Sequence, residues 1–178
     1  KNLLIPYLPG YRYLNKCLER RVLAVADRVA CVSEPWLYDL KANLSSQSDK
    51  FIVLSNGYDE DDIHPLPILA NSQCFTLTHI GSFYRNRRPD VLITAVDRLI
   101  TSKRIPISKI KVLFIGKNAR GIVPNRPPFE VLGYMEHKDL DRFRARTSVF
   151  LLLLSTSPDN IGNYSGKLFE YIASNRPI

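Results

Sequence analysis

Short runs of apolar residues alternate along the chain with segments whose apolar residues recur every three to four positions. The runs lie at residues 28–33, 51–54, 75–80, 110–115, 129–132 and 149–154. Runs of this kind predict buried strands, and the spacing between them predicts amphipathic helices. Strands that are apolar on both faces and separated by helices are typical of parallel sheets. The sequence therefore predicts an α/β, Rossmann-like fold with helices on both faces of its sheet.

Two of the predicted helices have clear starting signals. Ser33 is suited to cap the amino end of one helix, and Pro89 is suited to the first turn of another. The side chains expected to be buried are Trp36, Leu37 and Leu40 in the first of these helices, and Val91, Leu92, Ala95, Val96, Leu99 and Ile100 in the second. A later helix is predicted over residues 167–173.

The composition changes at residues 59–73. This stretch combines an acidic run with two prolines and shows no clear period, which indicates a linker. The part before it contains only two predicted strands, too few for an independent core. We therefore predict three segments: residues 1–58, a linker at 59–73, and a larger segment at 74–178.

The 178 residues include 25 Lys and Arg against 17 Asp and Glu, which gives a net charge of +8. This excess suits nucleic acid, an anionic membrane surface or a phosphate-bearing substrate, and it also suits a basic surface facing water. The chain lacks a G-x-G-x-x-G sequence, a P-loop and a G-x-S-x-G sequence. Nucleotide-dependent redox chemistry, ATP hydrolysis and serine hydrolysis therefore lose their main support.

Two loops carry candidate chemistry, because ligands of open parallel sheets bind beyond the carboxyl ends of the strands. The strand at 75–80 is followed by Gly81, then by Arg85, Arg87 and Arg88, and then by a helix. This order suits a phosphate group, although a solvated basic turn has the same composition. His79, near the end of that strand, is more typical of a hydrogen-bonded structural histidine than of a ligand contact.

The second loop spans residues 155–166 and is rich in small and polar residues. The free backbone N–H groups of the helix that follows would favour an anion. Glu170, one turn into that helix, can accept hydrogen bonds from paired hydroxyls such as those of a ribose. The alternative is a surface glutamate that stabilises the amino end of the helix.

Four sequence blocks occur in a characteristic order over nearly the whole chain. They are ADRVACVS (26–33) with VLSNGYD (53–59), HIGSFY (79–84) with Arg87 and Pro89, VLGY (131–134), and SGKLFEYIA (165–173) with RPI (176–178). Together they resemble the group 1 (family 4-like) glycosyltransferases of the GT-B fold. The resemblance implies a fragment that covers the end of an acceptor-side amino-terminal domain, up to about Tyr58. It would also cover most of the donor-binding domain, which would be incomplete at its carboxyl end.

The resemblance implies a donor-binding set of Gly81, Arg85, Arg87, Arg88, Gly133, Tyr134, Ser165, Lys167 and Glu170. The resemblance implies that Gly81 and Arg87 contact the donor diphosphate, with Arg85 and Arg88 as nearby alternatives, and that residues 133–134 border the nucleobase. Ser165 lies where backbone N–H groups meet the phosphates or the donor sugar, and Glu170 would bind the ribose. Many members have a glutamate eight residues before Glu170, where this chain has Gly162.

The implied activity is transfer of a sugar from a UDP- or GDP-linked donor to a polysaccharide or glycolipid acceptor. The resemblance implies no cofactor and no metal, because arginines and helix amino termini offset the charge of the leaving diphosphate. It also implies a cytoplasmic enzyme with peripheral association at the inner membrane face. Its catalytic residues would lie upstream of Lys1, so we expect the chain to bind nucleotide without catalysing transfer.

Two other classes of protein compete with this interpretation. One is a non-catalytic, flavodoxin-like module that binds phosphate or nucleotide. The other is a nucleic-acid binder, which lacks interleaved exposed aromatics and a recognisable RNA or DNA motif.

Overall fold

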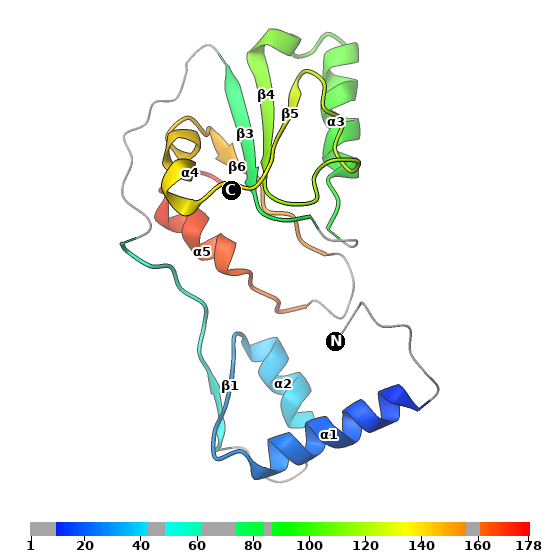
Figure 1. Ribbon diagram of the computed structural model, residues 1–178, viewed down its shortest axis with the longest axis vertical. Helices are drawn as coiled ribbons and strands as arrows, with labels where there is room; N and C mark the ends of the chain where they lie inside the picture. The colour runs from blue at the N-terminus through cyan, green and yellow to red at the C-terminus, as the bar shows by residue number, and fades with distance from the viewer. Residues whose placement is uncertain (1–9, 43–48, 62–73, 84–86, 156–160) are drawn as a thin grey trace. The chain divides into compact units, whose positions relative to one another are not determined.

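The computed structural model describes residues 10–42, 49–61, 74–83, 87–155 and 161–178 (Figure 1). The chain divides into two compact units. The first comprises Lys1–Asn56 with Ser157–Ser165, and the second comprises Gly57–Thr156 with Gly166–Ile178. Each unit contains parallel strands and helices, so the α/β class predicted from the sequence is confirmed. The residue limits of the linker remain a prediction, since residues 62–73 lie outside the described ranges.

The first unit contains a two-stranded parallel sheet. Its elements are α1 (Tyr11–Val25), β1 (Val29–Cys31), α2 (Glu34–Ala42) and β2 (Phe51–Val53), and the strand register pairs Val29 with Phe51. The core is formed by Leu23, Cys31, Leu37 and Phe51. The backbone N–H of Trp36 lies 3.5 Å from Ser33 Oγ, as expected if Ser33 caps α2.

The prediction that Trp36 is buried is wrong. Its exposed fraction is 37%, whereas that of the adjacent Leu37 is 9%. The helix α2 is nine residues long and packs on only two short strands. Such a small sheet covers a narrow stripe of the helix, and Leu37 occupies it.

The second unit is built on a four-stranded parallel sheet with the order β5-β4-β3-β6. Its strands are β3 (Phe75–Ile80), β4 (Ile110–Ile115), β5 (Phe129–Leu132) and β6 (Val149–Phe150), with a 3₁₀ turn, η1 (Ile107–Lys109), before β4. The helix α3 (Asp90–Thr101) covers one face, and α4 (His137–Arg144) and α5 (Gly166–Ala173) cover the other (Figure 1).

Alternate residues of β4 supply the cores on the two faces of this sheet. Val112 and Phe114 pack with Val96 of α3, whereas Ile115 packs with residues of α4 and α5. Because successive side chains of a strand point to opposite faces, a strand covered by helices on both sides is apolar throughout. This explains why IKVLFI has no alternation of polar and apolar residues.

The buried stripe of α3 differs from the predicted one. Val91 is 85% exposed and Ala95 is also exposed. The residues that pack on the sheet with Val96 are Leu92, Ile93 and Ile100. At 3.6 residues per turn, Val91 lies about 140° around the helix from Val96, so it points away from the sheet.

The strand predicted at 149–154 is shorter in the structure. β6 contains only Val149 and Phe150, and Leu154 is exposed. The backbone N–H of Leu151 still donates to Thr78 O at 2.8 Å. Beyond that point, the backbone N–H of Ile80 donates a hydrogen bond to the hydroxyl of Tyr171 from α5. β6 therefore ends because a helix side chain occupies the next pairing position along β3.

Candidate functional site

The carboxyl ends of β3, β4 and β5 each run into a glycine, at positions 81, 116 and 133. The N–H of Gly81 donates to Ile115 O at 2.7 Å, and the N–H of Gly116 donates to Gly133 O at 3.0 Å. The loops after β3 and β4 are also joined by a bond of 3.0 Å from Phe83 N–H to Lys117 O. The three glycines therefore form one continuous edge, at the end of the sheet where open parallel sheets bind ligands.

Gly116 is at a position that accepts only glycine. Its φ is +149°, and a Cβ atom there would lie 2.1 Å from the carbonyl oxygen of Gly81. That contact is with backbone that β3 and β4 hold in place, so it cannot relax by moving a side chain. Sequence reasoning did not include Gly116 in the site, although a glycine directly after a buried strand was an available signal.

Lys167 reaches from α5 to Gly81. A Cβ atom at Gly81 would lie 3.0 Å from Lys167 Cε and 3.3 Å from Lys167 Cδ. The absence of a side chain at Gly81 therefore leaves room for the lysine stem. The structure thus brings together two residues of the predicted set that are far apart in the sequence.

His79 forms the buried part of the same site. Its exposed fraction is 6%, and its Nδ1 lies 2.9 Å from the carbonyl oxygen of Leu151. Burial is the main cause that lowers the pKa of His79 to about 4. The charges of Lys167 and Arg87 lower it further, and the hydrogen bond to Leu151 acts in the opposite direction. His79 is therefore the hydrogen-bonded histidine that the sequence favoured, and it also lies beside Gly81.

The three predicted arginines differ in their surroundings. Arg87 is half-buried and close enough to His79 for its charge to influence that imidazole. Arg88 pairs with Asp90, with Nε 2.7 Å from Oδ2, and both side chains are about half exposed. This pairing raises the pKa of Arg88 and lowers that of Asp90. Arg88 thus matches the solvated alternative, and Arg85 lies outside the described residues.

Glu170 faces a buried arginine. Its Oε2 lies 3.7 Å from Nη2 of Arg144, whose side chain is 3% exposed and also bonds Asp141 Oδ1 at 3.1 Å. The carboxylate therefore lies opposite a cation of α4 and is not only a charge near the amino end of α5. Arg144 gave no signal in the sequence, since it is one of several basic residues in α4.

Tyr171 fixes α5 against the end of β3. Its hydroxyl accepts a hydrogen bond of 2.9 Å from Ile80 N–H and lies 3.2 Å from Ile80 O, to which it donates. Its ring stacks on Phe150 with centroids 4.3 Å apart and an interplanar angle of 10°. Burial is the main cause that raises the pKa of this phenol. Because Lys167 and Glu170 share α5 with Tyr171, this contact helps to set the positions of both.

Tyr134 lies at the same edge of the sheet, directly after Gly133. Its side chain is 67% exposed, and the ammonium of Lys117 lies 4.7 Å from the centroid of its ring. Lys117 follows Gly116, so the pair joins the loops after β4 and β5. Aromatic rings with an exposed face can stack on a planar ligand.

Ser165 belongs to the first unit, unlike the other described members of the predicted set, and so does Gly162, which is not a member of that set. Gly162 has a φ of +80°, and a Cβ atom there would lie 2.7 Å from Ser33 Oγ and from Pro35 Cβ. The carbonyl of neighbouring Tyr164 accepts a hydrogen bond of 2.7 Å from Asn56 Nδ2. The space around position 162 therefore excludes the glutamate that many members of the resembled family have there.

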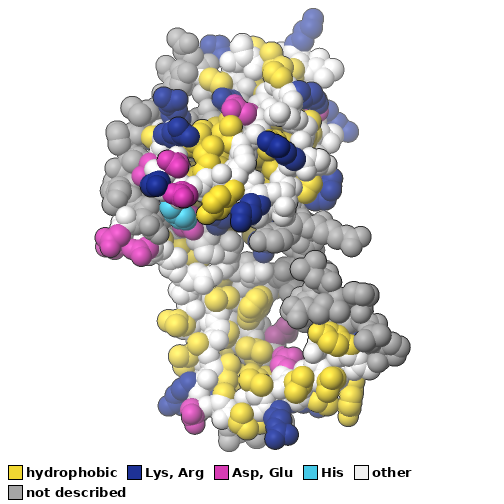
Figure 2. Space-filling model, in the orientation of Figure 1, with side chains coloured by type: hydrophobic (Ala, Val, Ile, Leu, Met, Phe, Trp, Pro, Cys, Tyr) yellow, Lys and Arg dark blue, Asp and Glu magenta, His cyan; other side chains and the backbone are white. Residues whose placement is uncertain are grey.

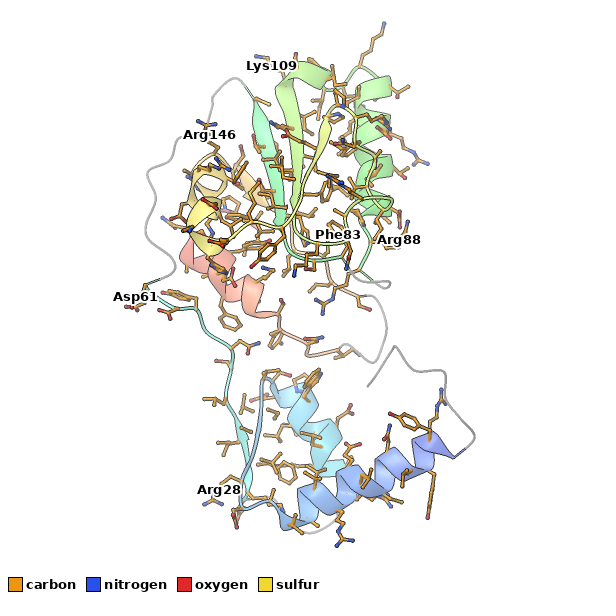
Figure 3. All side chains as sticks on the ribbon, viewed as in Figure 1. Arg28, Asp61, Phe83, Arg88, Lys109 and Arg146 are labelled. Atoms are coloured by element: carbon orange, nitrogen blue, oxygen red, sulfur yellow. The ribbon has the colours of Figure 1, made fainter. Side chains whose placement is uncertain are left out.

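Figure 2 shows Lys and Arg side chains spread over the second unit, in the upper part of the view, and not gathered into one patch on the visible face. Figure 3 labels Phe83 and Arg88 at one end of this unit, and Lys109 and Arg146 at the other.

A cavity of about 380 Å³ lies at the amino ends of β4 and β5 and is lined by Ile110, Pro128 and Phe129. Its charged lining residues are all paired, Lys111 with Glu130 at 2.6 Å and Arg126 with Asp97 at 2.7 Å, so the glycine edge is the better candidate site.

Across the ranges that the structure describes, His, Cys, Asp and Glu form no group of three that could hold a metal ion. In those same ranges, no helix has both the length and the apolar character needed to cross a membrane.

Comparison with known proteins gives a likeness in structure alone. No protein-family model and no curated protein sequence matches the chain. WaaG, a glycosyltransferase involved in lipopolysaccharide biosynthesis, is similar with a TM-score of 0.69, 16% identity, 98% coverage of this chain and 50% of that chain. HepE from Anabaena, solved with UDP and glucose, has a TM-score of 0.67 and 14% identity, with 96% of this chain and 48% of that chain covered. A glycosyltransferase from Rickettsia africae has a TM-score of 0.67 and 13% identity, with 97% of this chain and 48% of that chain covered.

These neighbours are glycosyltransferases of the GT-B fold, so the GT-B fold predicted from the four sequence blocks is confirmed. The chain spans about half the length of each of these solved chains.

Proposed function

We propose that this chain is part of a glycosyltransferase whose second unit binds a nucleotide-sugar donor. The observation that carries the proposal is the approach of Lys167 to Gly81, with Cε 3.0 Å from the Cβ position of the glycine. A cation over a glycine at the carboxyl edge of a parallel sheet is suited to a phosphate group. HepE, which shares the fold, was solved with UDP and glucose.

The site can stabilise the departure of a nucleoside diphosphate. Lys167 and Arg87 supply positive charge near Gly81, and the first turn of α5 supplies backbone N–H groups. Fixed charges and dipoles aimed at a developing negative charge lower the barrier to its formation. We therefore propose transfer without a metal ion, with these groups offsetting the charge on the leaving diphosphate.

The remaining residues are assigned to the nucleoside. The Glu170 carboxylate, oriented by Arg144, accepts hydrogen bonds from the ribose hydroxyls, while Gly133 and Tyr134 border the base. UDP- and GDP-linked hexoses are the donors that we propose, with a polysaccharide or glycolipid as acceptor. The description of WaaG as a glycosyltransferase involved in lipopolysaccharide biosynthesis supports this acceptor class. We further propose that the enzyme works in the cytoplasm, at the inner membrane face.

Calorimetric titration of the 178-residue chain with UDP, GDP and their hexose conjugates tests the proposal. We expect one nucleoside diphosphate to bind and its affinity to fall at least tenfold in Lys167→Ala and Arg87→Ala, which is about 1.4 kcal/mol for each charge-assisted contact. Glu170→Gln should weaken binding of the nucleoside diphosphate more than binding of inorganic pyrophosphate, because it acts on the ribose.

Lys109→Ala and Arg146→Ala are matched controls, because they remove the same charges at the other end of the sheet (Figure 3). Both should bind like the wild type. Equal losses in the controls would mean that only general electrostatic attraction is involved. Absence of binding by any nucleoside diphosphate would favour the non-catalytic module.

A further inference from the structure

His79 and Lys167 come from different elements and meet beside Gly81. A Cβ atom at Gly81 would lie 3.1 Å from His79 Nε2 and 3.0 Å from Lys167 Cε, so both atoms surround the same point. The ammonium nitrogen of Lys167 is one bond beyond Cε. The two distances place Nε2 and Cε within about 6 Å of each other, and the charge of Lys167 is close enough to influence the imidazole.

The partner of Nδ1 fixes the protonation of the imidazole ring. A backbone carbonyl can only accept a hydrogen bond, so the 2.9 Å contact to Leu151 O places the proton on Nδ1. The neutral ring then has a lone pair on Nε2, which makes this atom an acceptor. An ammonium group is the donor that such an acceptor needs, and Lys167 is the cation beside it.

The ring of His79 is also held in position by aromatic neighbours. Phe83 contacts it at a centroid distance of 5.1 Å and an angle of 62°, and Phe114 lies at 6.4 Å. A lysine side chain loses rotamer freedom when it is fixed, which costs free energy. A rigid acceptor that fixes it before the ligand arrives reduces the cost of binding.

We propose that His79 is a positioning residue of this site, whose Nε2 accepts a hydrogen bond from the Lys167 ammonium and holds it over Gly81 to meet the donor diphosphate. This inference rests on the proposed function, because it assigns a role within the same donor site. His79 acts through Lys167 and does not itself contact the phosphates.

Two substitutions of His79 distinguish the role of Nδ1 from the role of Nε2. In His79→Asn the side-chain amide can still donate to Leu151 O, but no atom reaches the position of Nε2. In His79→Gln the longer side chain can place an acceptor near that position. We expect His79→Asn to weaken UDP or GDP binding about tenfold, a typical effect of losing a hydrogen bond to a charged group, and His79→Gln to recover most of it.

The coupling between the two residues is tested with Lys167→Met, which keeps the stem and removes the charge. If His79 acts through the ammonium, His79→Asn should cause little further loss in a chain that already has Lys167→Met. Losses that simply add in the double variant would overturn the proposal. Unchanged binding in His79→Asn, with weakened binding in Lys167→Met, would overturn it and leave the proposed function intact.

Nitrogen-15 spectra of the histidine side chains provide a readout that does not depend on a His79 variant folding. We expect the Nδ1-protonated tautomer in the wild type at neutral pH. We expect a shift of the Nε2 resonance in Lys167→Met, with Nδ1 unchanged. An Nε2 resonance that does not respond to Lys167→Met would overturn the proposal. Absence of nucleoside diphosphate binding in the wild type would overturn both the inference and the proposed function.

Discussion

Gly81 and Gly116 end neighbouring strands, yet each is a glycine for a different reason. At Gly116 an added Cβ would meet the backbone of Gly81 at 2.1 Å, and the φ of +149° is strained for any other residue. At Gly81 an added Cβ would meet the distal carbons of Lys167 at 3.0 and 3.3 Å and Nε2 of His79 at 3.1 Å. The backbone geometry therefore requires glycine at position 116, whereas Gly81 makes room for the side chain of Lys167.

Alanine substitutions should separate these two requirements. We expect Gly116→Ala to lower the free energy of unfolding by about 2–4 kcal/mol, because backbone must move and the strained φ is retained. Gly81→Ala should lower it by less, about 1 kcal/mol, because the stem of Lys167 can move and the ring of His79 has to give by only a few tenths of an ångström. It should also displace Lys167 and weaken nucleoside diphosphate binding. Urea denaturation and calorimetry measure the two effects. Similar stability losses in both variants would contradict this assignment.

The buried imidazole of His79 should make stability depend on pH. Its pKa is about 4 in the folded chain against 6.5 for an ordinary histidine, so the unfolded chain takes up the proton first. The contribution is therefore complete above about pH 6.5 and declines as the pH falls towards 4. The total loss is roughly 3 kcal/mol, since each pKa unit corresponds to about 1.4 kcal/mol.

The measurement is the difference in the free energy of unfolding between the wild type and His79→Asn at several pH values. This difference removes the contribution of carboxylates, which titrate in both chains. We expect the advantage of the wild type to shrink between pH 6.5 and 4.5. A difference that is constant over this range would show that His79 is not held neutral in the folded state.

At the scale of elements, the contact between α5 and β3 determines the site. β6 ends at Phe150, so the Ile80 N–H and C=O that face it have no strand partner there. The Tyr171 hydroxyl bonds to both groups, and its ring stacks on Phe150. A buried backbone group without a partner is costly, so this hydroxyl has a structural as well as a positioning role.

Tyr171→Phe should lower the free energy of unfolding by about 1–3 kcal/mol, because it keeps the stacked ring but leaves the Ile80 backbone groups without that partner. It should also weaken nucleoside diphosphate binding, since Lys167 and Glu170 are on the same helix. Urea denaturation and calorimetry provide the two measurements. Tyr134→Phe is the control, because its hydroxyl is on an exposed side chain and its removal should not change stability.

The predicted elements show what periodicity can establish. The strands at 75–80, 110–115 and 129–132 have the bounds that were predicted, because glycine or proline residues near their ends mark the turns locally. The faces of α2 and α3 were predicted less well, as the exposure of Trp36 and Val91 shows. Both helices have apolar residues on more than one side, and only the sheet against which they pack selects the buried face.

On the scale of the whole molecule, the chain has two units and corresponds to about half of each solved relative. We therefore expect the chain to bind a nucleoside diphosphate without transferring sugar. The assay is release of UDP or GDP from the donor that binds, in the presence of oligosaccharide and lipid-linked acceptors. Detectable transfer to any of these acceptors would contradict the expectation.

The same preparation tests independence from metal ions. If Lys167 and Arg87 offset the charge of the diphosphate, treatment with EDTA should leave its affinity unchanged. A loss of binding that added Mg²⁺ or Mn²⁺ restores would show that a cation shares this role.

The sequence determined the alternation of strands and helices, the GT-B fold through its four blocks, and the positions of Gly81 directly after a strand and of Lys167 at the start of a helix. These features are local, because period, turn residues and short motifs are set by neighbouring residues. Only the tertiary structure decided that Lys167 reaches Gly81, that His79 lies beside them, and that Arg144 faces Glu170. Those contacts join residues distant in sequence, and they depend on how α4 and α5 pack on the sheet. The same is true of Gly162, whose lack of room for a side chain comes from Ser33 and Pro35, more than a hundred residues away.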